Sequence, residues 1–238
     1  HTYAPSVDIG LTTNGFLLPA QAAKLKKAGL RRVNISLDSL NQDTLNYIVQ
    51  KDVLEQVLTG INAAVAAGLS IKLNSVILRG INDHEIVSLF EYAKGIGAQI
   101  RYIEYMENSH ASNALQGLRS DEIIAILGKS YPFIPIDKEV NGPADLYETP
   151  DGYRFGTIEP HRHDFCATCD RLRLTAEGDL IGCLYFEGAK SIKEAIREGN
   201  STKAAEILAD VVFNKPEKNL WGIDNVEVSS RAFYRTGG

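Results

Sequence analysis

The chain has only three cysteines, and none of them lies before residue 166. An odd number of cysteines in one short stretch is unlike the disulfide framework of a secreted protein, so the sequence predicts a reducing, cytoplasmic compartment. No apolar run reaches the roughly 18 residues that span a bilayer, and the first residues do not resemble a signal peptide. The net charge of −5 argues against a general nucleic-acid binder, although local basic clusters can still bind anions.

The first half of the chain alternates strand-like and helix-like segments. Strands are expected at residues 7–13, 32–38, 70–78 and 99–106, and helices at 19–30, 51–67 and 84–97. This alternation predicts a parallel sheet, and four such units without closure predict an incomplete βα barrel. The regular pattern stops after Met106, before helices expected at 120–128, 189–198 and 202–213. We therefore expect an α/β partial barrel over residues 1–108 and a smaller α+β domain over residues 109–238.

All three cysteines fall in the stretch "HDFCATCDRLRLTAEGDLIGCL". Cys166 and Cys169 form a CxxC pair, and Cys183 follows after thirteen residues. The segments on either side of "AEGD" predict a β-hairpin with a two-residue turn centred on Glu177 and Gly178. Because the second strand runs back along the first, Cys183 is expected opposite residues 171–173, within reach of the CxxC loop.

Three interpretations of the clustered thiols remain open. The cysteines are buried without a ligand, or they hold a structural zinc ion with His161 or His163 as the fourth ligand, or they hold an iron–sulfur cluster. A cluster with three thiolates leaves one iron open to a ligand. Arg171 and Arg173 favour this third interpretation, because side chains two apart on a strand point to one face. Two guanidiniums there would offset negative charge and clamp a phosphate, unless they form only a solvated strand face.

Polar residues also recur at the ends of the predicted parallel strands, where a βα barrel has its active site. Such residues are unfavourable in a buried sheet unless they contact a ligand or one another, so they predict a pocket for a large polar ligand. By strand they are Thr12, Thr13 and Asn14; Asn34, Ser36 and Asp38; Lys72 and Asn74; and Tyr102, Glu104 and Met106.

Five stretches together resemble the GTP 3′,8-cyclase family of molybdenum cofactor biosynthesis, whose members are radical S-adenosylmethionine (SAM) enzymes. They are "LTTNG", "RVNISLDSL", "KLNSVILRGIND", "IRYIEYM" and "FCATCDRLRLTAEGDLIGC". The resemblance implies a 4Fe–4S cluster on Cys166, Cys169 and Cys183, whose open iron meets the guanine of GTP. It implies GTP contacts at Thr12, Lys72, Arg171 and Arg173, SAM contacts at Ser36 and Met106, and a tail ending in Gly237 and Gly238 that reaches the active site.

The chain departs from the family pattern in one respect. The family carries CxxxCxxC for a second, SAM-cleaving 4Fe–4S cluster, and no cysteine here precedes Cys166. The chain also begins abruptly at His1, so we expect a fragment of a longer enzyme that does not cleave SAM alone. The resemblance further implies a homodimer whose product passes to cyclic pyranopterin monophosphate synthase, with no membrane or nucleic-acid partner. A peptide-modifying radical SAM enzyme and a non-catalytic zinc-binding module are the alternatives.

Overall fold

The computed structural model describes residues 6–106, 115–139, 142–162, 169–184 and 188–216. The chain divides into a first unit of residues 1–105 and 115–159, and a second unit of residues 106–114 and 160–238. The first segment of the first unit ends close to the boundary expected near residue 108, but this unit also includes residues 115–159. Residues 134–158 supply three further strands to the sheet of the first unit, because β7 pairs with β4 in parallel.

The first unit is built on one seven-stranded sheet with the order β1-β2-β3-β4-β7-β6-β5. Its strands are β1 (Gly10–Thr13), β2 (Arg32–Ser36), β3 (Ser70–Val76), β4 (Gln99–Ile103), β5 (Ile134–Ile136), β6 (Asp145–Glu148) and β7 (Arg154–Ile158). Strands β1 to β4 and β7 pair in parallel, whereas β5 and β6 join in antiparallel pairs. The predicted incomplete βα barrel is thus confirmed as a largely parallel, open sheet.

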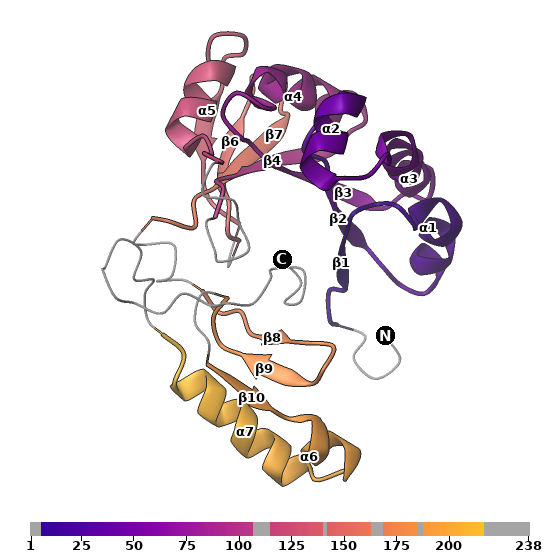
Figure 1. Cartoon of the computed structure of the whole chain (residues 1–238), viewed down its shortest axis with the longest axis vertical. Coiled ribbons are helices and arrows are strands. Elements are labelled where there is room, and N and C mark those ends of the chain that lie inside the picture. Colours follow the sequence, from indigo (N-terminus) through magenta and orange to yellow (C-terminus); the bar gives the residue numbers. More distant parts are fainter. Residues whose placement is uncertain (1–5, 107–114, 140–141, 163–168, 185–187, 217–238) are drawn as a thin grey trace. The chain divides into compact units, whose positions relative to one another are not determined.

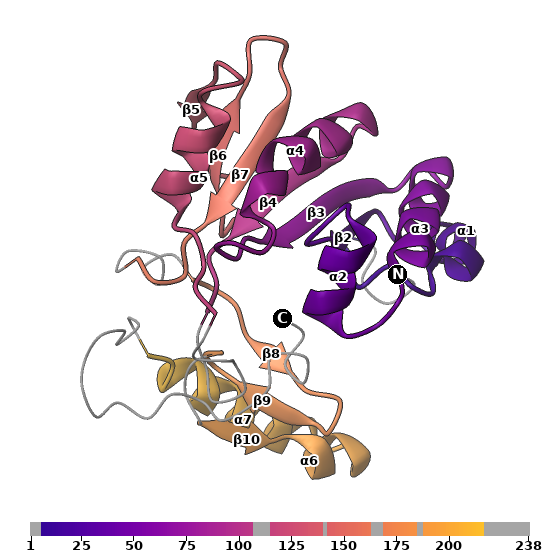
Figure 2. The same cartoon turned by 45° about the horizontal axis from the view of Figure 1, so that its top comes forward.

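Helices cover one side of this sheet (Figures 1 and 2). They are α1 (Leu18–Lys27), α2 (Gln42–Val49), α3 (Leu54–Ala66), the short 3-10 helix η1 (Asp83–Glu85), α4 (Ile86–Gly95) and α5 (Ser120–Leu127). The apolar core lies between the helices and the sheet, and includes Val33, Ile35, Leu73 and Ile100 from the strands. These strand residues alternate with polar ones, so the polar side chains point to the opposite side of the sheet.

Two local features were not predicted in the first unit. Helix α2 lies in a segment for which we predicted no element, and the side chain of Asn41 caps it by accepting from Thr44 N at 3.0 Å. Asn before a short amphipathic segment is a recognisable start signal that could have identified this helix. Gly60 lies inside α3 because a Cβ there would collide with the carbonyl oxygen of Gly15.

The second unit combines a small antiparallel sheet with two helices. The sheet has the order β10-β9-β8, from β8 (Arg173–Leu174), β9 (Asp179–Ile181) and β10 (Ala189–Ser191). Helices α6 (Lys193–Arg197) and α7 (Ser201–Phe213) follow, so the first residues of the helix expected at 189–198 form a strand instead. Leu180, Ile192 and Val211 form its small core. In the described residues of both units, no helix has the length and apolarity needed to cross a membrane.

Candidate functional site

The polar strand residues stand in two rows across the side of the sheet that the helices leave open. The first row is Thr12, Asn34, Lys72 and Gln99, and the second is Ser36, Asn74 and Arg101. Aligned residues on neighbouring strands share a face. The predicted GTP contacts Thr12 and Lys72 therefore lie on one row, two strands or about 10 Å apart.

Hydrogen bonds hold the side chains of this polar face in fixed positions. Asn34 Nδ2 donates to Thr12 Oγ1 at 3.1 Å, and Arg101 Nε and Nη2 both donate to Asn74 Oδ1, at 2.9 and 2.7 Å. Asn34 Oδ1 is buried and has no hydrogen-bond partner within the described residues. A buried acceptor without a donor is unfavourable, which fits a face built to receive a polar ligand.

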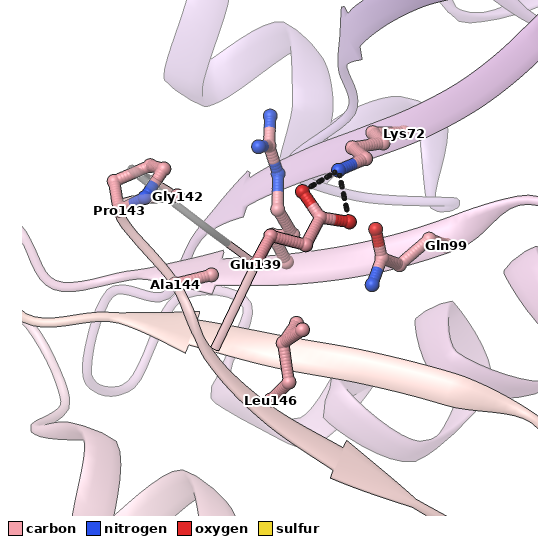
Figure 3. Close-up of a pocket in the computed structure, with 8 residues that line it drawn as sticks. Lys72, Gln99, Glu139, Gly142, Pro143, Ala144 and Leu146 are labelled. Carbon is pink, nitrogen blue, oxygen red and sulfur yellow. Dashed lines mark hydrogen bonds and ion pairs between the residues drawn. The ribbon is translucent and has the colours of Figure 1, made fainter. Parts of the chain in front are cut away.

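The polar face carries positive charge beside a small, shallow pocket that Lys72, Arg101 and Glu139 help to line. Lys72 Nζ donates to both carboxylate oxygens of Glu139, at 3.0 and 2.9 Å, as the dashed lines in Figure 3 show. Burial lowers the pKa of Arg101 to about 10, Glu139 opposes this shift, and the charge of Arg32 adds to it. Arg101 remains charged at neutral pH, so the pocket suits an anion.

The sequence analysis placed two residues on the wrong face, one in β4 and one directly after it. Tyr102 is fully buried in the core, where its hydroxyl donates to Ile86 O at 2.7 Å. Glu104 is also buried and accepts a hydrogen bond from Ser120 N at 2.8 Å. Pairing of β4 with β3 instead aligns Arg101 with Asn74 on the polar face. Period-two alternation identifies the two sets of side chains but does not say which set meets the helices.

Asp38 was also expected among the ligand-facing residues, but its contacts are structural. Its carboxylate accepts from Val76 N at 2.8 Å, and burial raises its pKa to about 6. The fully buried Asn82 completes this connection. Its Nδ2 donates to the carbonyl oxygens of Asp38 and Val76 at 2.6 and 2.9 Å, and its Oδ1 accepts from Leu78 N at 2.7 Å. Asn82 thereby joins the carboxyl ends of β2 and β3.

The two predicted SAM contacts lie in different units. Ser36 is exposed at the carboxyl end of β2, and the partly buried Met106 belongs to the second unit. Their role in binding SAM stays a prediction. Gly237 and Gly238 lie outside the described residues, as do Cys166 and His163.

The predicted hairpin is present, with a turn shifted by one residue. Gly178 N donates to Thr175 O at 3.0 Å, so the central turn residues are Ala176 and Glu177 rather than Glu177 and Gly178. Gly178 has φ of 95°, and Thr175 N donates to Asp179 O at 2.9 Å. This is a three-residue connection with glycine in the left-handed region.

The observed turn sets the register of the strands on either side. Arg173 pairs with Ile181, and the same register continued by two residues sets Arg171 opposite Cys183. Cys183 is therefore returned to the arginine segment, as the sequence predicts.

The two described cysteines lie among cations. Burial opposes ionisation of the partly buried Cys169, but the backbone and side chain of Arg171, together with Lys215, lower its pKa below the ordinary value. Arg173 has a lowered pKa, first because of burial and then because of the Arg171 charge, and Cys169 and Cys183 act against this shift. Metals bind the thiolate form of cysteine, and neighbouring cations favour that form. The donor chemistry here therefore fits a metal centre.

Lys215 is a site residue that the sequence analysis missed. It lies 46 residues from Cys169 in the chain, and its ammonium donates to Cys169 Sγ at 3.3 Å. No spacing rule connects the two positions. In the part of the chain that the structure describes, no group of three or more His, Cys, Asp or Glu side chains could hold a metal. His161 therefore does not join Cys169 and Cys183 in such a group, while Cys166 lies outside the described residues.

Two family models match the chain and define its class. Residues 3–93 match the radical SAM superfamily, and residues 98–221 match Molybdenum Cofactor Synthesis C. A solved radical SAM methyltransferase from Sphaerobacter thermophilus has 17% sequence identity and a TM-score of 0.42, and covers 51% of this chain and 37% of its own. The assignment rests on the sequence matches and not on this weak structural similarity. The chain is a radical SAM protein of molybdenum cofactor biosynthesis, and this superfamily implies SAM and a 4Fe–4S cluster as cofactors.

The curated relatives narrow the class to one family. A GTP 3′,8-cyclase from Campylobacter fetus is 54% identical over 237 residues, which cover 99% of this chain and 74% of the relative. The GTP 3′,8-cyclase from Aliarcobacter butzleri is 54% identical over 238 residues, with the same coverage of both chains. That from Sulfurimonas denitrificans is 51% identical over 236 residues. The chain belongs to the GTP 3′,8-cyclase family, and the resemblance seen in the sequence is confirmed.

Proposed function

We propose that this chain binds GTP and SAM for the conversion of GTP to 3′,8-cyclo-7,8-dihydro-GTP, the first step of molybdopterin biosynthesis. The observation that carries the proposal is the identity of 54% to a GTP 3′,8-cyclase over 99% of the chain. The cationic polar face of the sheet and the cysteine–arginine hairpin are the two features that suit such a ligand.

The polar face of the first unit would bind part of the substrate. Thr12 offers a hydroxyl and Lys72 an ammonium on one row of the sheet, and Lys72 already pairs with the carboxylate of Glu139. An ammonium that donates hydrogen bonds to a carboxylate can also donate them to a phosphate of GTP. Ser36, at the carboxyl end of β2, and Met106 would contact SAM.

The hairpin of the second unit would hold the auxiliary 4Fe–4S cluster through Cys166, Cys169 and Cys183. Three thiolates leave one iron free for the guanine base. Arg171 and Arg173 would bind the phosphates, and the tail ending in Gly237 and Gly238 would close on the site.

In the whole enzyme, a second 4Fe–4S cluster and SAM would supply the radical chemistry that joins C3′ of the ribose to C8 of guanine; the cysteines for that cluster are not among the three of this chain. The residues described above would contribute by holding GTP in one orientation. This matters because a radical reacts with whichever C–H bond it meets, and fixed geometry limits that choice. Side chains that are already locked by hydrogen bonds, such as Asn34 and Arg101, suit this role.

We further propose that the protein works in the cytoplasm as a homodimer and passes its product to cyclic pyranopterin monophosphate synthase. The clustered cysteines suit a reducing compartment.

GTP binding by the chain, reconstituted anaerobically with iron and sulfide, tests the proposal. We expect a brown protein with about four irons at the auxiliary site. Replacing Arg171 and Arg173 together by alanine should weaken GTP binding by more than about tenfold, or roughly 1.4 kcal/mol. Lys72→Met should also weaken it, while the exposed Arg154→Ala and Arg197→Ala pair should match the parent chain. Unchanged GTP affinity in the first double variant contradicts the phosphate role, and tightly bound zinc instead of iron favours the zinc-binding module.

A further inference from the structure

Lys215 lies where the last described helix of the second unit ends. Helix α7 ends at Phe213, and Pro216 disfavours helical backbone in the residue before it. The ammonium of Lys215 donates to the carbonyl oxygens of Cys169 and Arg171, at 2.6 and 2.9 Å, and to Cys169 Sγ at 3.3 Å. An ammonium has three hydrogens, so these contacts engage its whole donor capacity. The Lys215 side chain is thereby fixed against the segment that carries Cys169.

The backbone of Lys215 also contacts the other cysteine segment. Gly182, which directly precedes Cys183, is buried beside it. A Cβ added to Gly182 would lie 3.6 Å from both Cα and Cβ of Lys215, and 3.4 Å from Val211 O. The end of α7 therefore packs against the strand that returns Cys183 to the hairpin. Lys215 is in contact with both described cysteine segments at once.

Two other described lysines of the second unit have ordinary surface environments, unlike Lys215. Lys190 pairs with the carboxylate of Asp210, and Lys203 is exposed in the first turn of α7. Lys215 is instead partly buried, with a thiol and two carbonyl groups as partners. Burying an ammonium is unfavourable without such partners, and for Lys215 all three partners belong to the segment that carries Cys169.

We propose that Lys215 is a positioning residue of the auxiliary metal centre. Its two carbonyl bonds fix the loop of Cys169, and its N–H···S bond acts on a sulfur that would ligate iron. Hydrogen bonds and positive charge at ligand sulfurs stabilise the reduced, more negative state of an iron–sulfur cluster and so raise its reduction potential. This inference rests on the proposed auxiliary cluster. It adds Lys215, which follows α7, as a residue that contacts a ligand cysteine of the cluster and not the iron itself.

The test compares the anaerobically reconstituted parent chain with Lys215→Met, Lys215→Arg and the matched control Lys203→Met. Iron and sulfide per chain, the rate of iron loss to a chelator, and the reduction potential followed by electron paramagnetic resonance are measured for each. We expect Lys215→Met to lose iron roughly tenfold faster and to have a lower potential, as outer-sphere changes at metal sites do. Lys215→Arg keeps the charge and donors and should restore most of the potential, while Lys203→Met should behave as the parent.

The outcomes separate this inference from the proposed function. If the parent binds the cluster and Lys215→Met keeps the parental potential and rate of iron loss, the role of Lys215 is overturned. The proposal of an auxiliary cluster on the hairpin is then still supported. If the parent binds no iron, the auxiliary cluster is overturned and the inference with it. Circular dichroism reports whether each variant folds, and Lys215→Gln, which keeps a neutral donor, carries the same test if the methionine variant does not fold.

Discussion

Replacing Asn82 tests how much its hydrogen bonds stabilise the carboxyl ends of β2 and β3. Asn82 is fully buried, and its side chain makes hydrogen bonds with Leu78 N and with the carbonyl oxygens of Asp38 and Val76. A side-chain hydrogen bond contributes about 1 kcal/mol on average, so the loss of three gives about 3 kcal/mol. Alanine would also leave these backbone groups buried without partners. We therefore expect Asn82→Ala to reduce the free energy of unfolding by roughly 3–5 kcal/mol.

Urea unfolding followed by circular dichroism measures this loss. Asn62→Ala is the matched control, because Asn62 is exposed on α3 and should change stability by no more than about 0.5 kcal/mol. A loss below about 1 kcal/mol in Asn82→Ala would refute the reasoning, since it would mean that the three bonds contribute no more than one average bond. Asn82→Asp should be destabilising as well, because a carboxylate cannot donate to the two carbonyl groups.

Two further predictions concern the cysteine hairpin and pH. Cys183→Ala should lose the bound iron of the reconstituted chain, and full metal retention in that variant would show that Cys183 is not a ligand. The pKa of Asp38 is raised from 3.8 to about 6 by burial, so the folded chain holds this proton more tightly than the unfolded one. Its stabilising contribution is fully present below pH 3.8 and is lost as pH rises through about 6. Asp38→Asn should therefore be more stable than the parent at pH 7.5, with a difference that shrinks toward pH 5 in urea unfolding; a pH-independent difference would contradict this.

The order of the first four strands could be predicted because each helix returns the chain by a short, right-handed connection. The face of each strand is harder to predict. Lys72 and Asn74 alternate with apolar residues and were assigned correctly, whereas on β4 both sets of residues include polar groups. Tyr102 is in the core because its ring packs there while its hydroxyl donates a hydrogen bond to Ile86 O. Only the pairing with β3 decides between the two sets.

The remaining differences arise from contacts between distant parts of the chain. Besides β3, β4 pairs in parallel with β7, which begins 51 residues after β4 ends. The short strands β6 and β5 then join β7 in antiparallel pairs. Local patterns cannot identify such pairs, so the sequence analysis did not assign residues 134–158 to the sheet of the first unit. Lys215 was missed for the same reason, since its partners lie in a loop far upstream.

The arrangement of cations is the strongest physical argument for an anionic ligand in this chain. Burial lowers the pKa of Arg101 on the polar face, and that of Arg173 on the hairpin, so both positions disfavour a charge. A fold selected only for stability would place apolar side chains there, because a desolvated cation costs more than it returns unless its partner is well placed. Arg101 uses two of its N–H groups, Nε and Nη2, to donate to Asn74 Oδ1. Charged side chains that are buried and held in position by hydrogen bonds reduce the stability of a fold. Their presence therefore indicates a functional site.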